Sequence, residues 1–253
     1  MYICSLMTEF AHDKIVPDQH SALSKKEQVA DMFNSIALRY DFLNHFLSAG
    51  IDVYWRKIAL KQLAAIKPQS LLDVATGTGD LAIMAEKILK PTKIIGIDIS
   101  EGMLEIGRQK IKKAGLEHII ELSTGDSEAI KHPNNSFDAV TVSFGVRNFE
   151  HLELGLSEIY RVLKPGGKLV ILEFSKPKGF LIKFIYNFYM KIITPLIGKM
   201  ISKNKNAYSY LDASIKKFPE GKEFIKVLDE IGYQNTQSKT LSLGICTIYF
   251  GIK

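Results

Sequence analysis

The segment LLDVATGTGD, residues 71–80, joins an apolar stretch to a helix-forming stretch through a loop that contains Gly77 and Gly79. Because glycine has no Cβ, the backbone of this loop can approach a ligand closely, and the helix that follows presents free N–H groups. Asp98 ends the next apolar stretch, where a carboxylate can accept hydrogen bonds from both hydroxyls of a ribose. These three residues predict a nucleoside-binding site.

The glycines alone do not separate a nucleoside from a dinucleotide. The dinucleotide pattern has a third glycine where this chain has Ala82, which is an allowed variant. Asp73 precedes the loop, and its negative charge favours a cationic ligand over a pyrophosphate. The alternative is that Asp73 is a strand-end residue whose carboxylate accepts from backbone N–H groups.

Apolar and amphipathic segments alternate through the centre of the chain. This alternation predicts a parallel sheet with helices on both faces, which binds ligands at the carboxyl ends of its strands. A C-terminal helix and two further strands, which we expect to be antiparallel, would complete the fold. The predicted strands are 70–76, 93–99, 118–122, 136–143, 168–174, 233–240 and 244–252, and the predicted helices of this region are 79–90, 100–115, 151–164 and 221–232.

The length of 253 residues predicts one large domain. Residues 1–24 show no periodicity, so we expect a flexible arm there and a single domain over 25–253. That domain would begin with a helical cap, residues 25–67, because apolar residues fall at helical spacing from Val29 and again over 53–66.

Composition excludes several classes of protein. The net charge of +6 favours anionic partners only mildly, and no basic run is interleaved with aromatic residues, so nucleic acid is not expected. The two cysteines, Cys4 and Cys246, are far apart and have no spacing that suits zinc, so we expect no metal site and a reducing, cytoplasmic location. We find neither a signal peptide nor an apolar run long enough to span a membrane.

The segment SFGVRNFEH, residues 143–151, ends the strand predicted over 136–143 with polar groups. Arg147 is a fixed cation, so it can stabilise an anion or polarise a water but cannot easily act as a base. The alternative role is a structural ion pair, for example with Glu150 or Asp126. His151 opens the next helix and is more readily explained as a surface or capping residue.

Several motifs resemble those of known enzymes. LLDVATGTGD, IIGIDIS, TGDSEAI, FDAVTVSFGVRN and RVLKPGGKLVILEFSKP resemble, in order, the motifs of class I S-adenosylmethionine-dependent methyltransferases. Within that class, the chain resembles the ubiquinone/menaquinone biosynthesis C-methyltransferases over about residues 25–251. The more particular segments are MFNSIALRYDFLNHFLSAGIDVYWRK, residues 32–57, SFGVRN, residues 143–148, LEFSKP, residues 172–177, and YSYLDASIKKFP, residues 208–219.

The resemblance implies an α/β fold of the Rossmann-like class I type, with a seven-stranded, mostly parallel sheet and one antiparallel strand. It implies methylation of a ring carbon of a polyprenylated quinol with S-adenosyl-L-methionine as donor, and family habit favours demethylmenaquinol in menaquinone biosynthesis. The alternatives are the benzoquinol of ubiquinone biosynthesis, another small molecule, a nicotinamide-dependent oxidoreductase and a catalytically silent scaffold.

The resemblance also places residues in the site. It implies cofactor contacts for Thr78, Asp98, the pair Asp126 and Ser127, and Ser143. Arg147 and Asn148 are the candidates for the substrate ring, with Tyr40 a weaker one from the helical cap. The complete predicted cofactor set is Asp73, Gly77, Thr78, Gly79, Asp98, Ile99, Asp126, Ser127 and Ser143.

Residues 179–201 are apolar and aromatic, yet carry Lys183, Lys191 and Lys199. They form most of a predicted substrate-side insert, 179–215. A basic, aromatic segment suits a prenyl tail or peripheral contact with anionic lipid at the inner face of the membrane. Plain packing or a homodimer contact explains it equally well.

Overall fold

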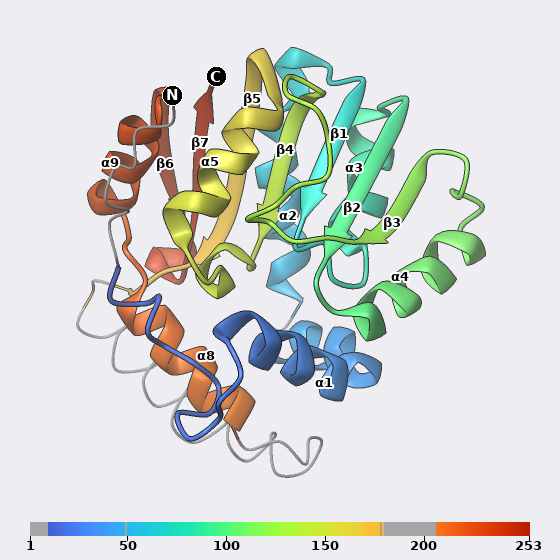
Figure 1. Ribbon diagram of the computed structural model, residues 1–253. Helices are drawn as coiled ribbons and strands as arrows, with labels where there is room; N and C mark the ends of the chain where they lie inside the picture. The colour runs from blue at the N-terminus through green and yellow to red at the C-terminus, as the bar shows by residue number, and fades with distance from the viewer. Residues whose placement is uncertain (1–9, 49, 178, 180–205) are drawn as a thin grey trace.

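The computed structural model describes residues 10–48, 50–177, 179 and 206–253. Its centre is a seven-stranded sheet in the order β3-β2-β1-β4-β5-β7-β6 (Figure 1). The pairs from β3 to β5 are parallel, and β7 is antiparallel to both of its neighbours, so the predicted sheet with one antiparallel strand is confirmed. The strands are β1 Ser70–Val74, β2 Lys93–Asp98, β3 Ile120–Thr124, β4 Phe137–Ser143, β5 Leu163–Phe174, β6 Gln234–Leu241 and β7 Cys246–Ile252.

Strand β5 begins earlier than predicted. The sequence around Pro165 predicts a turn, but Leu163 already pairs with Phe137 of β4, and the register shifts before Lys168 pairs with Ala139. The prediction missed this irregular start because proline and glycine are typical both of a turn and of a strand irregularity.

Helices cover both faces of the sheet. One face carries α5 and α9, and the other carries α2, α3 and α4. On α5 the residues Leu152, Leu156 and Ile159 are fully buried, as their helical spacing predicts, and each such side chain contributes about 2 kcal/mol of burial free energy. The helices are α1 Lys25–Leu47, α2 Ile51–Lys61, α3 Asp80–Leu89, α4 Glu101–Lys113, α5 Leu152–Val162, α8 Asn206–Lys217 and α9 Lys222–Ile231.

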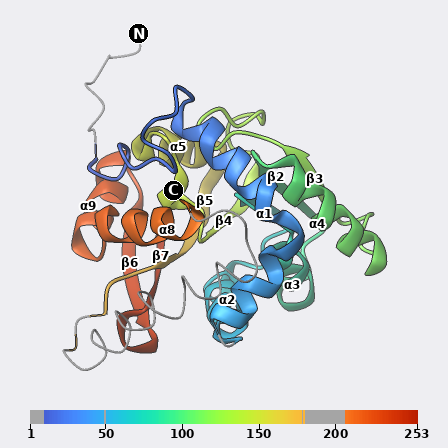
Figure 2. The same cartoon turned by 90° about the horizontal axis from the view of Figure 1, so that it is seen from below.

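Helices α1 and α8 lie outside this layered core, across the edge where the parallel strands end (Figure 1, Figure 2). The structure describes residues 10–24 of the predicted arm, and they pack on the domain. His12 is fully buried, and its ring meets that of Phe218 edge-on, with the ring centroids 5.4 Å apart. No helix among the described residues combines the length and the apolar character needed to cross a membrane.

Candidate active site

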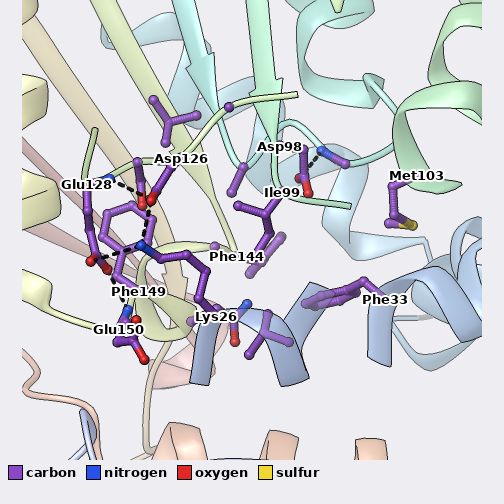
Figure 3. A pocket seen from close by; sticks show the side chains of 18 of the residues that line it. Lys26, Phe33, Asp98, Ile99, Met103, Asp126, Glu128, Phe144, Phe149 and Glu150 are labelled. Carbon is purple, nitrogen blue, oxygen red and sulfur yellow. Dashed lines mark hydrogen bonds and ion pairs between the residues drawn. The ribbon is translucent and has the colours of Figure 1, made fainter. Parts of the chain in front are cut away.

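A cavity opens between α1 and the carboxyl ends of β1, β2 and β4 (Figure 3). The space between its walls is about 640 Å³ when the solvent in its open mouth is included. Its wall consists of Lys26, Val29, Phe33, Tyr40, Val74, Ala75, Gly77, Asp98, Ile99, Met103, Gly125, Asp126, Ser127, Glu128, Ser143, Phe144, Gly145, Asn148, Phe149 and Glu150.

The loop after β1 is tied to Asp98 at the end of β2. Gly77 adopts a left-handed conformation with φ of 58°, and its N–H donates to Asp98 Oδ2 at 2.8 Å. The other oxygen, Oδ1, accepts from the N–H of Ser100 at 2.8 Å. Burial raises the pKa of Asp98. A carboxylate has further lone pairs beyond these two bonds, so Asp98 can still accept from a ligand.

Three predicted cofactor residues lie behind the wall of the cavity. Asp73 accepts from the hydroxyls of Thr76 at 2.6 Å and Thr141 at 2.7 Å, and burial raises the pKa of its carboxyl to about 6. Two side-chain hydroxyls thus take the place of the backbone N–H groups that the alternative interpretation required. Thr78 and Gly79 do not line the cavity either, whereas the other six predicted cofactor residues do.

Helix α1 is tied to three of the loops that form the cavity. Lys26 Nζ lies 2.5 Å from Asp126 Oδ2. In the middle of the helix, Asn34 Oδ1 accepts from the hydroxyl of Ser100, just before α4, at 2.7 Å. Near the end of the helix, Asp41 accepts from the Thr78 hydroxyl at 2.6 Å. These bonds join the helical cap to the loops after β1, β2 and β3.

A network of carboxylates surrounds Lys26, as Figure 3 shows. Besides Asp126, Lys26 Nζ reaches Glu128 Oε2 at 3.3 Å. The other oxygen, Glu128 Oε1, accepts from the backbone N–H groups of Glu150 at 2.7 Å and His151 at 2.9 Å. The ligand atoms of Glu128, Glu150 and His151 lie within 4.8 Å of one another. Since Glu128 serves these bonds, we infer no metal site from the cluster. Sequence reasoning missed Lys26 and Glu128, although Glu128 falls within the quoted segment TGDSEAI.

The end of β4 and the segment after it bring Ser143, Gly145 and Asn148 into the wall of the cavity. The Ser143 hydroxyl oxygen is buried and has no partner among the described residues. A Cβ on Gly145 would lie 2.4 Å from Ala75 Cβ, so only glycine fits there. Asn148 Oδ1 accepts from the hydroxyl of Tyr210 at 3.1 Å. Tyr40, the weaker candidate, also lines the cavity.

Arg147 is not among the residues that line the cavity. Its Nη1 donates to Glu173 Oε1 at 2.7 Å and to the carbonyl oxygen of Phe144 at 2.6 Å. Its ion-pair partner is therefore Glu173 of the LEFSKP segment, not Glu150 or Asp126. The guanidinium also lies over the ring of Phe174, 5.5 Å from its centroid.

The phenylalanines beside Arg147 form a stack with a second arginine. Phe174 stacks on Phe144 with ring centroids 4.5 Å apart. The guanidinium of Arg56 lies over the ring of Phe144, 5.9 Å from its centroid. Arg56 in turn pairs with Asp52 at 2.6 Å. The Arg56–Asp52 pair therefore lies against Phe144, which lines the cavity, and the Arg147–Glu173 pair lies against Phe174.

The cavity favours a ligand with positive charge. Among the described residues that line it, four carry a carboxyl group, whereas Lys26 alone carries an amine. A cleft lined mainly by one sign of charge concentrates ligands of the opposite sign.

The match to a family model decides the classification. The ubiE/COQ5 methyltransferase family model matches residues 21–253. The chain belongs to the ubiE/COQ5 methyltransferase family.

Curated relatives of this ubiE/COQ5 family chain are similar over nearly their whole length. A demethylmenaquinone methyltransferase of Bacteroides fragilis is 48% identical over 96% of this chain and 99% of its own. A ubiquinone/menaquinone biosynthesis C-methyltransferase UbiE of Geotalea daltonii is 44% identical over 90% of this chain and 97% of its own.

Solved structures share the fold of the ubiE/COQ5 family chain. A SAM-dependent methyltransferase of Thermotoga maritima, described as a possible histamine N-methyltransferase, has a TM-score of 0.63 and 18% identity, and covers 88% of this chain and 99% of its own. A putative S-adenosyl-L-methionine-dependent methyltransferase of Methanococcus maripaludis has a TM-score of 0.59 and 22% identity, and covers 93% of this chain and 97% of its own. At these identities the likeness extends to the fold alone.

Proposed function

We propose that this ubiE/COQ5 family chain methylates a ring carbon of a polyprenylated quinol with S-adenosyl-L-methionine, converting demethylmenaquinol to menaquinol in menaquinone biosynthesis. The observation that carries the proposal is the cavity at the carboxyl ends of β1, β2 and β4, which joins Asp98 to the SFGVRN segment. The B. fragilis relative, at 48% identity, supports the choice of substrate.

The residues of the cavity fit the cofactor. Asp98 would hold the ribose hydroxyls, and Asp126 would accept from the adenine amino group, while the excess of carboxylates suits the sulfonium and ammonium charges. Gly77 has a φ of 58°, and its lack of a Cβ suits close approach of the loop backbone to the ligand. When bound, S-adenosylmethionine supplies a methyl group that is already electrophilic, so the protein must mainly orient it.

The substrate half of the reaction needs more from the protein. The ring carbon of a neutral quinone is electron-poor, whereas a reduced quinol attacks well as its phenolate. The protein must therefore favour loss of the phenolic proton and stabilise the oxygen anion. Asn148 and Ser143 supply N–H and O–H donors in the wall of the cavity. Arg147, which lies behind that wall, stays a predicted catalytic residue. Tyr40 of α1 is likewise a predicted catalytic residue.

The proposal is tested by mass spectrometry of the quinone pool in cells that lack this protein. We expect a demethylated menaquinone precursor to accumulate, and an unchanged pool would refute the proposal. Calorimetric titration with S-adenosylhomocysteine and with NAD separates the methyltransferase from an oxidoreductase, and turnover of a reduced quinol separates it from a silent scaffold.

A second substrate is the benzoquinol of ubiquinone biosynthesis. The G. daltonii relative, whose name includes both quinones, favours this candidate at 44% identity. The same mass spectrometry decides between them, because each substrate leaves a different demethylated precursor. Another small-molecule substrate would leave both quinone pools unchanged.

Membrane contact and a homodimer stay predictions. The segment 179–201 lies outside the described residues except for residue 179. We propose that it receives the prenyl tail or contacts anionic lipid from the cytoplasmic side. Co-sedimentation with anionic liposomes should fall when Lys183, Lys191 and Lys199 are replaced by glutamine, and no change would count against lipid contact.

A further inference from the structure

Tyr210 connects α8 to the segment after β4. Its side chain is 3% exposed and packs with Val29 and Met32 of α1, and its hydroxyl donates to Asn148 Oδ1 at 3.1 Å. Burial raises the pKa of Tyr210 far above its ordinary value. The phenol therefore stays protonated and acts on Asn148 as a hydrogen-bond donor.

This contact determines which end of the Asn148 carboxamide serves the cavity. A carboxamide has one oxygen that accepts and one NH₂ group that donates, and Tyr210 holds the oxygen. Among the described residues, none accepts from Asn148 Nδ2, although Asn148 lines the cavity. The backbone beneath is also held, because the Asn148 N–H donates to the Gly145 carbonyl oxygen at 2.9 Å. The group left for a ligand is the donor.

The orientation matters for the chemistry of a quinol. An N–H group stabilises a phenolate oxygen, whereas a carboxamide oxygen in the same place repels it. If the carboxamide could rotate by half a turn, the site would present the wrong end for part of the time. The Tyr210 hydroxyl disfavours that rotation because the NH₂ group cannot accept its proton.

We propose that Tyr210 is a positioning residue for methyl transfer, which fixes the Asn148 carboxamide so that its NH₂ group faces the substrate oxygen that becomes anionic. The inference rests on the proposed function and deepens it, because it assigns the site to substrates with an ionisable ring hydroxyl. Tyr210 lies in the segment YSYLDASIKKFP, residues 208–219.

The phenol first loses its proton, and the electron pair of the oxygen moves into the ring as the ring carbon bonds to the methyl carbon and the methyl–sulfur bond breaks. The ring then loses the hydrogen of that carbon as a proton, which returns the electron pair to the oxygen, and the oxygen takes up a proton. One proton is released to water for each methyl group transferred, and the charge that Asn148 stabilises is largest before the carbon–carbon bond forms.

The test compares Tyr210→Phe with the wild-type chain on reduced demethylmenaquinol. The change removes only the hydroxyl, so the ring keeps its place beside Val29 and Met32. We expect kcat to fall about tenfold, less than the 10²–10³ typical of deleting an oxyanion donor, with little change in KM or in affinity for S-adenosylhomocysteine. The acidic limb of the pH profile of kcat should move up by about one unit, because a phenolate that loses a donor forms less readily.

Tyr233→Phe is the matched control. Tyr233 is also 3% exposed, and its hydroxyl donates to the Leu156 carbonyl oxygen at 3.1 Å, outside the residues that line the cavity. It should change thermal stability about as much as Tyr210→Phe does and leave kcat and its pH profile at wild-type values. Equal losses of kcat in the two variants would mean that lost stability explains the effect, and would overturn the proposal.

A double-mutant cycle with Asn148→Ala separates positioning from a direct role. If Tyr210 acts through Asn148, Tyr210→Phe should lower kcat in the wild-type background and change it less than twofold in the Asn148→Ala background. Additive losses, or an unchanged kcat in Tyr210→Phe, would refute the inference alone. A wild-type chain that binds S-adenosylhomocysteine but never methylates reduced quinols would refute the proposed function together with the inference.

Discussion

Replacing Glu173 with glutamine tests the buried ion pair behind the cavity. Glu173 is fully buried and Arg147 is 6% exposed, with Oε1 and Nη1 2.7 Å apart. Two unit charges about 4 Å apart at an effective dielectric constant of about 20 attract by about 4 kcal/mol, and loss of one partner from a buried pair typically costs about 3–5 kcal/mol. Glutamine keeps an acceptor oxygen for the N–H of Phe174, so the change removes mainly the charge.

The expected loss converts directly into a melting temperature. Unfolding entropy of about 2.1 cal/mol/K per residue over 253 residues means that 1 kcal/mol corresponds to about 2 °C. Glu173→Gln should therefore lower the melting temperature by about 6–10 °C at neutral pH, measured by calorimetry or dye fluorescence. The control is Glu121→Gln, which removes an exposed pair with Lys93 at 2.9 Å and should cost under about 1 kcal/mol.

Equal shifts in Glu173→Gln and Glu121→Gln would refute this reasoning, because they would show that the charge of Arg147 needs no buried counterion. Activity is measured on the same samples. Arg147→Ala should abolish methyl transfer with cofactor affinity nearly unchanged, and the double variant Arg147→Met with Glu173→Met separates this from instability, since it leaves no buried charge unpaired. A stable double variant that still turns over a reduced quinol would remove Arg147 from the mechanism.

Three further predictions follow from buried groups. Asp73 has a pKa of about 6 in the fold against an ordinary 3.8, so the folded state binds the proton more tightly and stability falls as pH rises from about 4 to about 6. Asp73→Asn should abolish that slope and raise stability at pH 7 by up to about 3 kcal/mol, and a melting temperature unchanged at pH 7 would contradict it. His12 has a pKa of about 3 against 6.5, so stability falls as pH drops below 6.5. His12→Phe should remove about 2 kcal/mol of acid destabilisation between pH 7 and pH 5, which urea titrations at both values would detect. Gly145→Ala places a methyl group 2.4 Å from Ala75 Cβ and should cost about 1–3 kcal/mol and weaken S-adenosylhomocysteine binding in calorimetry; wild-type affinity would show that the loop yields at no cost.

Local patterns predicted the sheet because they depend on neighbours in the chain. The spacing of Leu152, Leu156 and Ile159 identified α5. The helix predicted over 100–115 is α4, and Ser100 caps it, since its hydroxyl accepts from the N–H of Met103. Alternation of strands and helices then leaves few topologies, which is why the sequence alone predicts the ligand-binding edge of the sheet.

Contacts between distant segments could not be predicted in the same way. Lys26 meets Asp126 across 100 residues, and Tyr210 meets Asn148 across 62. The charge of Arg147 identified it as a candidate, but its ion-pair partner depends on β5 lying beside β4. Nothing in the sequence distinguishes Glu173 from the other acidic residues. Asp73 likewise signalled a charge near the loop without revealing the two threonines that hold it.

The ties between α1 and the loops have a consequence for hydrogen exchange. Lys26, Asn34 and Asp41 each contact a loop that also forms the cavity, so opening α1 breaks bonds at three edges of the ligand site. A ligand at 100 times its dissociation constant stabilises the bound state by about 2.7 kcal/mol. The amides of α1 should therefore exchange about 100-fold more slowly with S-adenosylhomocysteine present, although the protection originates in loops far from them in the sequence. Proteolytic nicking within α1 should become rarer by the same factor, which makes the helix a reporter of cofactor occupancy.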